Sequence, residues 1–287
     1  MFALLLPLHI SSAQVIETQT GIEYCSADGL SLLMDYAYPD TAGTGSRLPA
    51  VVLIHGGGWR SGQRGAMLPK TRQLADHGYF AATIDYRLTR SDSENDPMRV
   101  GADYRDIIQD VKCAVRHLKS NADSYGIDPQ RIATFGTSAG AHLAAMIGVN
   151  RTDWHDNNGQ YQEVDSSVAA VVNWFGPQDL KYVHENSEDS RAFIEDLLQG
   201  TPDEMPARYY TASPINHLDP DDPAIITIHG SHDGTVPVGV AKLFHEACLN
   251  MGVEHELNIV PDGTHGLSEH QDMAMNKTIM FLNGQLK

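Results

Sequence analysis

The chain has 287 residues, of which 41% are hydrophobic and 20% are charged, a composition typical of a globular protein with one large core. Its 37 acidic and 20 basic residues give a formal net charge of −17, which would repel nucleic acid and anionic lipid, because both bind clustered Lys and Arg. We therefore expect no nucleic-acid partner and no stable membrane insertion. The oligomeric state stays open.

The first residues resemble the end of a secretory signal. An apolar run, Met1 to Ile10, is followed by Ser11-Ser12-Ala13, a small-residue cleavage pattern, although the usual basic segment before the run is missing. The run is shorter than the ~20 residues that cross a membrane. We expect residues 1–13 to be a signal-peptide remnant and the protein to be secreted or periplasmic; the alternative is a frayed apolar N-terminus. Residues 14–287 then form a single domain.

The three cysteines leave one unpaired in any scheme, and none belongs to a C-x-x-C pair. We therefore expect neither a disulfide framework nor a zinc knuckle. Cys113 and Cys248 fall in helical patterns, where a free cysteine usually acts as a small core residue.

Strands and helices alternate along the rest of the chain. Gly21–Cys25 and Leu30–Tyr38 are predicted as two antiparallel strands around a turn at Asp28-Gly29. The elements expected after them are strand Ala50–Ile54, helix Met67–His77, strand Phe80–Ile84, a helix with an apolar face from Tyr104 to Leu118, strand Arg131–Phe135, helix Ala141–Val149, strand Val168–Trp174, strand Ala224–His229, helix Val238–Asn250, strand Glu254–Val260 and a helix from Glu269. This order predicts a mostly parallel central sheet with helices on both faces. The polar stretch Pro177–Asp222 interrupts the alternation, and we expect no helical lid from it.

The segment Gly136-Thr137-Ser138-Ala139-Gly140 joins a short strand directly to an apolar helix. A serine between glycines at such a junction is the pattern of a nucleophile elbow, because the glycines keep side chains from colliding in the sharp turn. The alternative is an ordinary glycine-rich turn. The pattern predicts Ser138 as a nucleophile over the N-terminus of the helix, where unpaired N–H groups favour an oxyanion.

Two other strand ends carry the groups that a serine nucleophile needs. Asp233 follows the next-to-last predicted strand, and His265 lies between glycines after the last one. His265 would take the serine proton, and Asp233 would fix the imidazole tautomer. The order Ser, Asp, His is the one expected for this architecture. Asp179 is a rival acid, whose simpler interpretation is a helix N-cap.

The run His55-Gly56-Gly57-Gly58 follows a buried strand. Successive glycines allow backbone N–H groups to point at an oxyanion, so we expect Gly57 and Gly58, together with Ala139, to form the oxyanion hole. His55 is expected to anchor this loop.

Three further side chains are candidates for a place near the site. Trp59 and Trp174 are possible walls of a substrate pocket, with buried packing as the alternative, and we expect His142 to be structural. We expect no metal site, because the nearby His229, His232 and Asp233 are better interpreted as the loop that carries the acid.

Several motifs together resemble the α/β-hydrolase esterases, in the branch named for bifunctional feruloyl and acetyl-xylan esterases, near the hormone-sensitive-lipase group. These motifs are His55-Gly56-Gly57-Gly58-Trp59, Asp85-Tyr86-Arg87-Leu88, Tyr125 to Ile132, Gly136 to Gly140, Phe175-Gly176-Pro177 and Asp233 to Pro237. The resemblance implies ester hydrolysis without a cofactor and places Ser138, Asp233 and His265 on the triad positions of the family.

The chain departs from the related families in two respects, at Ala141 in the elbow helix and in the helical cap that the hormone-sensitive-lipase group carries before the glycine loop. The esterases often have glycine where Ala141 stands, and the elbow helix is also similar to that of kynurenine formamidases, whose glycine loop has an aromatic residue where Gly58 stands. Only 54 residues precede His55, so we expect no sizeable N-terminal cap and an open site.

These observations favour a serine carboxylesterase acting on short-chain or polysaccharide-borne acyl esters, with acetyl to butyryl groups preferred because no lid supplies a long apolar wall. An arylformamidase-like amidase is an alternative that shares the triad. A non-catalytic binding protein with the hydrolase fold is a second alternative, and it predicts a broken triad.

Overall fold

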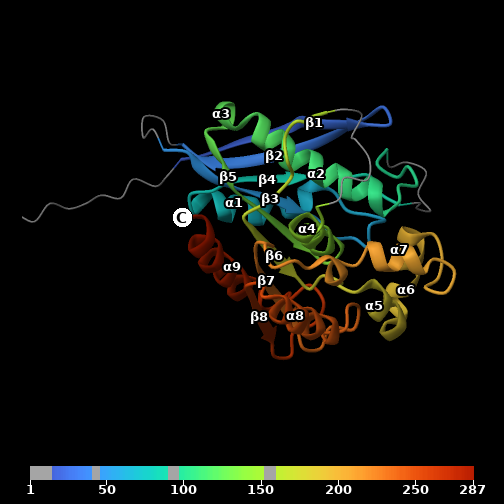
Figure 1. Cartoon of the computed structure of the whole chain (residues 1–287). Helices are drawn as coiled ribbons and strands as arrows, with labels where there is room; N and C mark the ends of the chain where they lie inside the picture. The colour runs from blue at the N-terminus through green and yellow to red at the C-terminus, as the bar shows by residue number, and fades with distance from the viewer. Residues whose placement is uncertain (1–14, 41–45, 90–96, 152–159) are drawn as a thin grey trace, which may run out of the picture.

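The computed structural model describes residues 15–40, 46–89, 97–151 and 160–287, so the predicted signal-peptide remnant lies outside the described residues. An eight-stranded sheet forms the centre of the molecule (Figure 1). Its strands are β1 (Ile16–Ala27), β2 (Leu30–Pro39), β3 (Leu48–Ile54), β4 (Phe80–Ile84), β5 (Ile127–Thr137), β6 (Ala170–Trp174), β7 (Ala224–Gly230) and β8 (His255–Val260). The helices are α1 (Leu68–Asp76), α2 (Tyr104–Ser120), α3 (Ala122–Tyr125), α4 (Ala139–Val149), α5 (Leu180–Asn186), α6 (Glu188–Leu198), α7 (Pro206–Thr211), α8 (Gly239–Met251) and α9 (Gln271–Leu286), with short 3-10 turns η1 (Arg64–Met67) and η2 (Pro214–His217).

The strand order is β1-β2-β4-β3-β5-β6-β7-β8. β1 and β2 are antiparallel, β2 also runs antiparallel to β4, and every pairing from β4 to β8 is parallel. The predicted α/β fold with a mostly parallel sheet is thereby confirmed. The first hairpin turns at Asp28 and Gly29, whose φ angles of 51° and 79° both lie in the left-handed region, as a type I′ turn requires.

Helices cover both faces of the sheet, which explains the continuous apolar run of β3. Val51 and Leu53 lie in a core cluster with residues of α1 and α9, whereas Val52 and Ile54 lie in the cluster that includes residues of α2, α4 and α8. Successive side chains of a strand point to opposite faces, so a strand covered on both sides needs apolar residues at every position. No helix in the described part of the chain is long and apolar enough to cross a membrane.

The stretch between β6 and β7, from which we expect no helical lid, is helical. It folds into α5, α6 and α7, which gather at one end of the molecule (yellow to orange in Figure 1). Asp179 and Ser187 cap α5 and α6 by accepting hydrogen bonds from Tyr182 N and Ser190 N, and α7 begins at Pro206. α5 and α7 have only 7 and 6 residues, too few for an apolar periodicity to identify a helix from the sequence.

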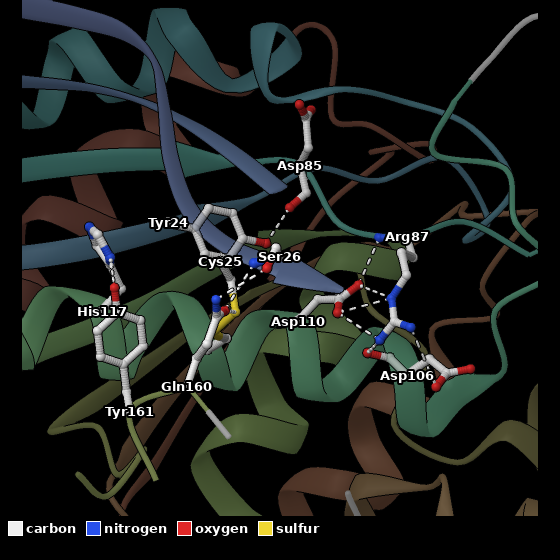
Figure 2. The surroundings of a disulfide bond; sticks show 11 residues. Tyr24, Cys25, Ser26, Asp85, Arg87, Asp106, Asp110, His117, Gln160 and Tyr161 are labelled. Atoms are coloured by element: carbon white, nitrogen blue, oxygen red, sulfur yellow. Dashed lines mark hydrogen bonds and ion pairs between the residues drawn. A yellow bond between two sulfur atoms is a disulfide. The ribbon is translucent and has the colours of Figure 1, made fainter. Parts of the chain in front are cut away.

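Cys25 and Cys113 form a disulfide, contrary to the expectation of no disulfide framework. The bond joins β1 to α2 across a sequence separation of 88 residues (Figure 2). The spacing of the cysteines in the sequence does not indicate this pair, because only the packing of β1 on α2 brings the two residues together. Cys248 is free and buried, as predicted.

Arg87, from the Asp85-Tyr86-Arg87-Leu88 motif, ties the same region together (Figure 2). Its guanidinium lies 2.8 Å from an oxygen of Asp110 on α2 and 2.6 Å from one of Asp28 in the hairpin turn. Burial raises the pKa of Asp110 to about 6, although the hydrogen bonds and charge of Arg87 oppose this shift. The Tyr24 hydroxyl donates to the carbonyl of Asp85 at 2.6 Å. The loop after β4 is thereby fixed to the hairpin and to α2.

Candidate active site

Ser138 occupies a strained turn between β5 and α4. Its φ of 53° and ψ of −123° lie in a region that residues other than glycine rarely adopt. A Cβ at Gly136 would lie 2.0 Å from the carbonyl oxygen of Gly140, and one at Gly140 would lie 2.2 Å from that of Ile54. Only glycine fits at both positions, which accounts for the pattern around the serine.

The three residues predicted as a triad lie in hydrogen-bond contact, although they come from three separate strand ends. His265 Nε2 lies 3.0 Å from Ser138 Oγ, and His265 Nδ1 lies 2.8 Å from Asp233 Oδ2. The Asp233 side chain is fully buried, whereas that of His265 is 26% exposed. The imidazole therefore connects a buried carboxylate to the hydroxyl of a half-buried serine.

Asp233 is held in place from several sides. Its Oδ1 accepts hydrogen bonds from Thr235 N at 3.0 Å and Val236 N at 2.8 Å, and its Oδ2 lies 3.2 Å from Nε2 of the buried His229. Burial alone would raise the pKa of Asp233, but the hydrogen bonds from His229 and His265 hold it below its usual range. Asp233 is therefore a carboxylate at neutral pH and can orient the imidazole.

Sequence reasoning assigned no separate role to His229 and missed Phe175. His229 Nε2 also contacts the carbonyl of Val236 at 2.8 Å, so the histidine holds the loop that carries Asp233. Phe175 follows β6 with a φ of 45°, and its ring meets the His265 imidazole edge to face at 4.9 Å. In the sequence, the role of His229 could have been inferred from its position four residues before Asp233, and that of Phe175 from its position at the end of a strand.

The glycine loop lies directly against the nucleophile. A Cβ built on Gly56 would stand 3.2 Å from Ser138 Cβ. Gly57 and Gly58 have φ angles of 118° and 60°, which favour glycine, and the Gly57 carbonyl accepts from Arg60 N. That carbonyl is thus turned toward the following residues of the loop.

His55 anchors the loop, as expected. Its ring stacks on Tyr86 with centroids 4.2 Å apart, and the Tyr86 hydroxyl donates to the His55 carbonyl at 3.0 Å. The motif residue Tyr86 thereby holds the start of the glycine loop.

Both tryptophans are buried, which agrees with the packing alternative rather than with a pocket wall. Trp174 has no exposed surface, and its indole N–H donates to Thr278 Oγ1 on the face covered by α9. Trp59 is 3% exposed and packs edge to face on His142 at 5.2 Å. His142 is buried and bonded to the Ala212 carbonyl at 2.7 Å, in line with its expected structural role.

Asp179 and His232 take no part in the hydrogen bonds of the triad. Asp179, the rival acid, caps α5, and the His232 side chain is 67% exposed and pairs with Asp262 at 3.5 Å. Within residues 15–40, 46–89, 97–151 and 160–287, no group of three or more His, Cys, Asp or Glu side chains is arranged to hold a metal ion.

The family model BD-FAE matches residues 34–248, which is more than half of the chain. The chain belongs to the BD-FAE family. The predicted resemblance to α/β-hydrolase esterases of the feruloyl and acetyl-xylan esterase type is therefore confirmed.

Curated relatives and solved structures agree with this family. "Probable carboxylic ester hydrolase LipM" of Mycobacterium tuberculosis is 31% identical over 225 residues, covering 77% of this chain and 49% of that protein, so the chain spans about half the length of this relative. A "truncated form of carbohydrate esterase from gut microbiota" has a TM-score of 0.78 and 28% identity, covering 96% of this chain and 98% of that one. The propionate-bound esterase Est2 of Thermogutta terrifontis has a TM-score of 0.74 and 26% identity, covering 95% and 93%.

Proposed function

We propose that this member of the BD-FAE family is a serine carboxylesterase that works through an acyl-enzyme intermediate. The observation that carries the proposal is the position of His265, whose two ring nitrogens contact Ser138 and Asp233 at 3.0 and 2.8 Å. A serine hydroxyl is too weak an acid to attack an ester unaided, and a base oriented by a carboxylate activates it.

In the acylation step, Ser138 Oγ attacks the ester carbonyl while its proton moves to His265 Nε2. The negative charge that develops on the carbonyl oxygen is stabilised by the N–H groups of Gly57, Gly58 and Ala139. Asp233 stabilises the imidazolium. The bond to the leaving oxygen then breaks, and the proton on Nε2 passes to the departing alcohol.

Deacylation repeats these steps with water as the nucleophile. His265 Nε2 removes a proton from water, the hydroxide adds to the acyl carbon, and the second tetrahedral intermediate expels Ser138 Oγ, which recovers the proton. The products are a carboxylic acid and an alcohol. Every proton is carried by residues of the chain, so the proposed cycle uses neither a metal nor another cofactor.

We propose short-chain or polysaccharide-borne acyl esters, of the acetyl or feruloyl type, as substrates. The solved structures that support this class include the carbohydrate esterase and a bifunctional GH43-CE of Bacteroides eggerthii, which has a TM-score of 0.81 and 29% identity over 94% of this chain and 38% of that one. An imidazole that is partly exposed to solvent suits an alcohol portion too large to enter the protein.

We also propose that the protein functions outside the cytoplasm. The Cys25–Cys113 disulfide supports this location, because such bonds form and persist in oxidising compartments and are rare in the cytosol of mesophiles.

The central test compares the wild-type protein with Ser138→Ala on nitrophenyl acetate, acetylated xylan, methyl ferulate and N-formylkynurenine. We expect the variant to keep its fold and to lose turnover by ~10⁴ or more, the scale seen when a triad nucleophile is removed. Paraoxon should label Ser138 in the wild-type protein. Near-normal turnover by folded Ser138→Ala would refute the nucleophile, and faster cleavage of the formamide than of any ester would favour the amidase alternative.

A further inference from the structure

Helix α6 of the segment between β6 and β7 packs its Phe193 ring onto the glycine loop. A Cβ built on Gly58 would lie 2.7 Å from Cδ1 and 3.0 Å from Cγ of Phe193. The half-buried ring therefore fills the space that a side chain at position 58 would occupy. An apolar surface thus stands beside the backbone that we assign to the oxyanion hole.

Arg60 contacts both this ring and the helix that carries it. It belongs to the same loop as Gly58, and its Nη2 donates to the Ala192 carbonyl at 2.8 Å. Its guanidinium also forms an ion pair with Asp196 and lies 4.8 Å from the centroid of the Phe193 ring. Three contacts from one side chain hold α6 against the loop, so the ring is a fixed wall.

The position of the ring indicates which part of an ester it meets. The leaving oxygen must lie next to His265 Nε2, because it receives the proton from that atom. His265 is bordered by Phe175, at 4.9 Å, whereas Phe193 borders the glycine loop. Phe175 therefore borders the imidazole that faces the leaving group, whereas Phe193 borders the backbone assigned to the oxyanion hole.

We propose that Phe193, held by Arg60, is the residue that limits the length of the acyl group. This inference rests on the proposed esterase function and adds the specificity-determining residue to it. Acetyl to butyryl groups fit between the ring and the nucleophile, and longer chains collide with the ring. The alcohol portion does not meet Phe193.

The test measures kcat/KM for nitrophenyl esters from acetyl to decanoyl in the wild-type protein, Phe193→Ala and Phe193→Leu. Each methylene newly buried in the space left by the ring contributes about fourfold, so the octanoyl-to-acetyl ratio should rise roughly tenfold or more in Phe193→Ala and less in Phe193→Leu. Arg60→Met, which loses the hydrogen bond and ion pair, should shift the ratio in the same direction. Acetyl esters with different alcohols should show no comparable change.

Tyr210→Ala is the matched control, because Tyr210 is an aromatic residue of the neighbouring α7 and is 59% exposed. We expect its acyl-length profile to match the wild type. A change in the octanoyl-to-acetyl ratio of less than about threefold in the Phe193 variants is smaller than the effect of one buried methylene and would overturn the inference. A change in kcat/KM that depends on the alcohol and not on the acyl length would also overturn it. If Phe193→Ala fails to fold, Phe193→Leu and Arg60→Met decide by the same criterion. If the wild-type protein cleaves acetyl esters and paraoxon labels Ser138, the proposed esterase function holds even where the inference about Phe193 fails.

Discussion

The disulfide between Cys25 and Cys113 should contribute a large share of the stability of the folded domain. In the chain-entropy model, cross-linking residues 88 positions apart restricts the unfolded ensemble by about 4.5 kcal/mol at 25 °C. Unfolding 287 residues at about 2.1 cal/mol/K per residue corresponds to an entropy change of about 0.6 kcal/mol/K. Replacing both cysteines by alanine should therefore lower Tm by about 8 °C.

The assay is thermal unfolding of protein isolated from an oxidising compartment, followed with and without a thiol reductant. The reductant should bring the wild-type Tm down toward that of Cys25→Ala/Cys113→Ala and leave the double variant unchanged. Cys248→Ala is the control, because Cys248 is buried and unpaired and should keep the response to reductant. Denatured wild-type protein should present a single free thiol.

Two results would refute this reasoning. Three free thiols in the denatured, unreduced protein would show that the bond does not form in that compartment. Equal Tm values for the wild type and the double variant, with the bond shown to be present, would mean that the cross-link does not restrict the unfolded chain as assumed.

Two further predictions concern buried histidines. Replacing His229 by leucine removes the group that lies 3.2 Å from Asp233 Oδ2, and we expect kcat to fall about tenfold with KM nearly unchanged. His229→Gln should restore part of the lost kcat. A wild-type kcat in the leucine variant would refute the positioning role. Burial lowers the pKa of His142 to about 4, so between pH 4 and about 6.5 the unfolded chain binds a proton at this residue that the folded protein does not. The free energy of unfolding therefore has its full value above a pH of about 6.5 and decreases progressively as the pH falls toward 4. The pH dependence of the unfolding free energy should therefore be shallower in His142→Asn by about 1.4 kcal/mol per pH unit over this window, and parallel curves for the two proteins would contradict the assignment.

The sequence predicted the triad because local constraints identify each of its parts. Gly136 and Gly140 have no room for a Cβ, so the turn that presents Ser138 can be recognised from residue types alone. Asp233 and His265 follow parallel strands, whose carboxyl ends meet at one edge of the sheet. Strand order was therefore enough to bring together residues that are far apart in the chain.

The residues that the sequence misjudged depend on contacts between distant segments. Cys25 and Cys113 meet because β1 packs on α2, and Trp174 is directed toward α9 rather than the site because of the face on which its side chain lies. At a strand end either face is available to a side chain, and a shift of one position reverses the choice. Pattern alone could not decide these cases.

The preference for short acyl groups shows how the same expectation can rest on different causes. From the sequence, the limit follows from the absence of an apolar wall, since no helical lid is expected between Pro177 and Asp222. The structure instead places α6 there, with the Phe193 ring against Gly58. If the limit came from a missing wall, removing the ring would leave long acyl groups as poorly used as before. If the ring is the limit, its removal admits them, so the Phe193 variants distinguish two explanations that predict the same wild-type profile.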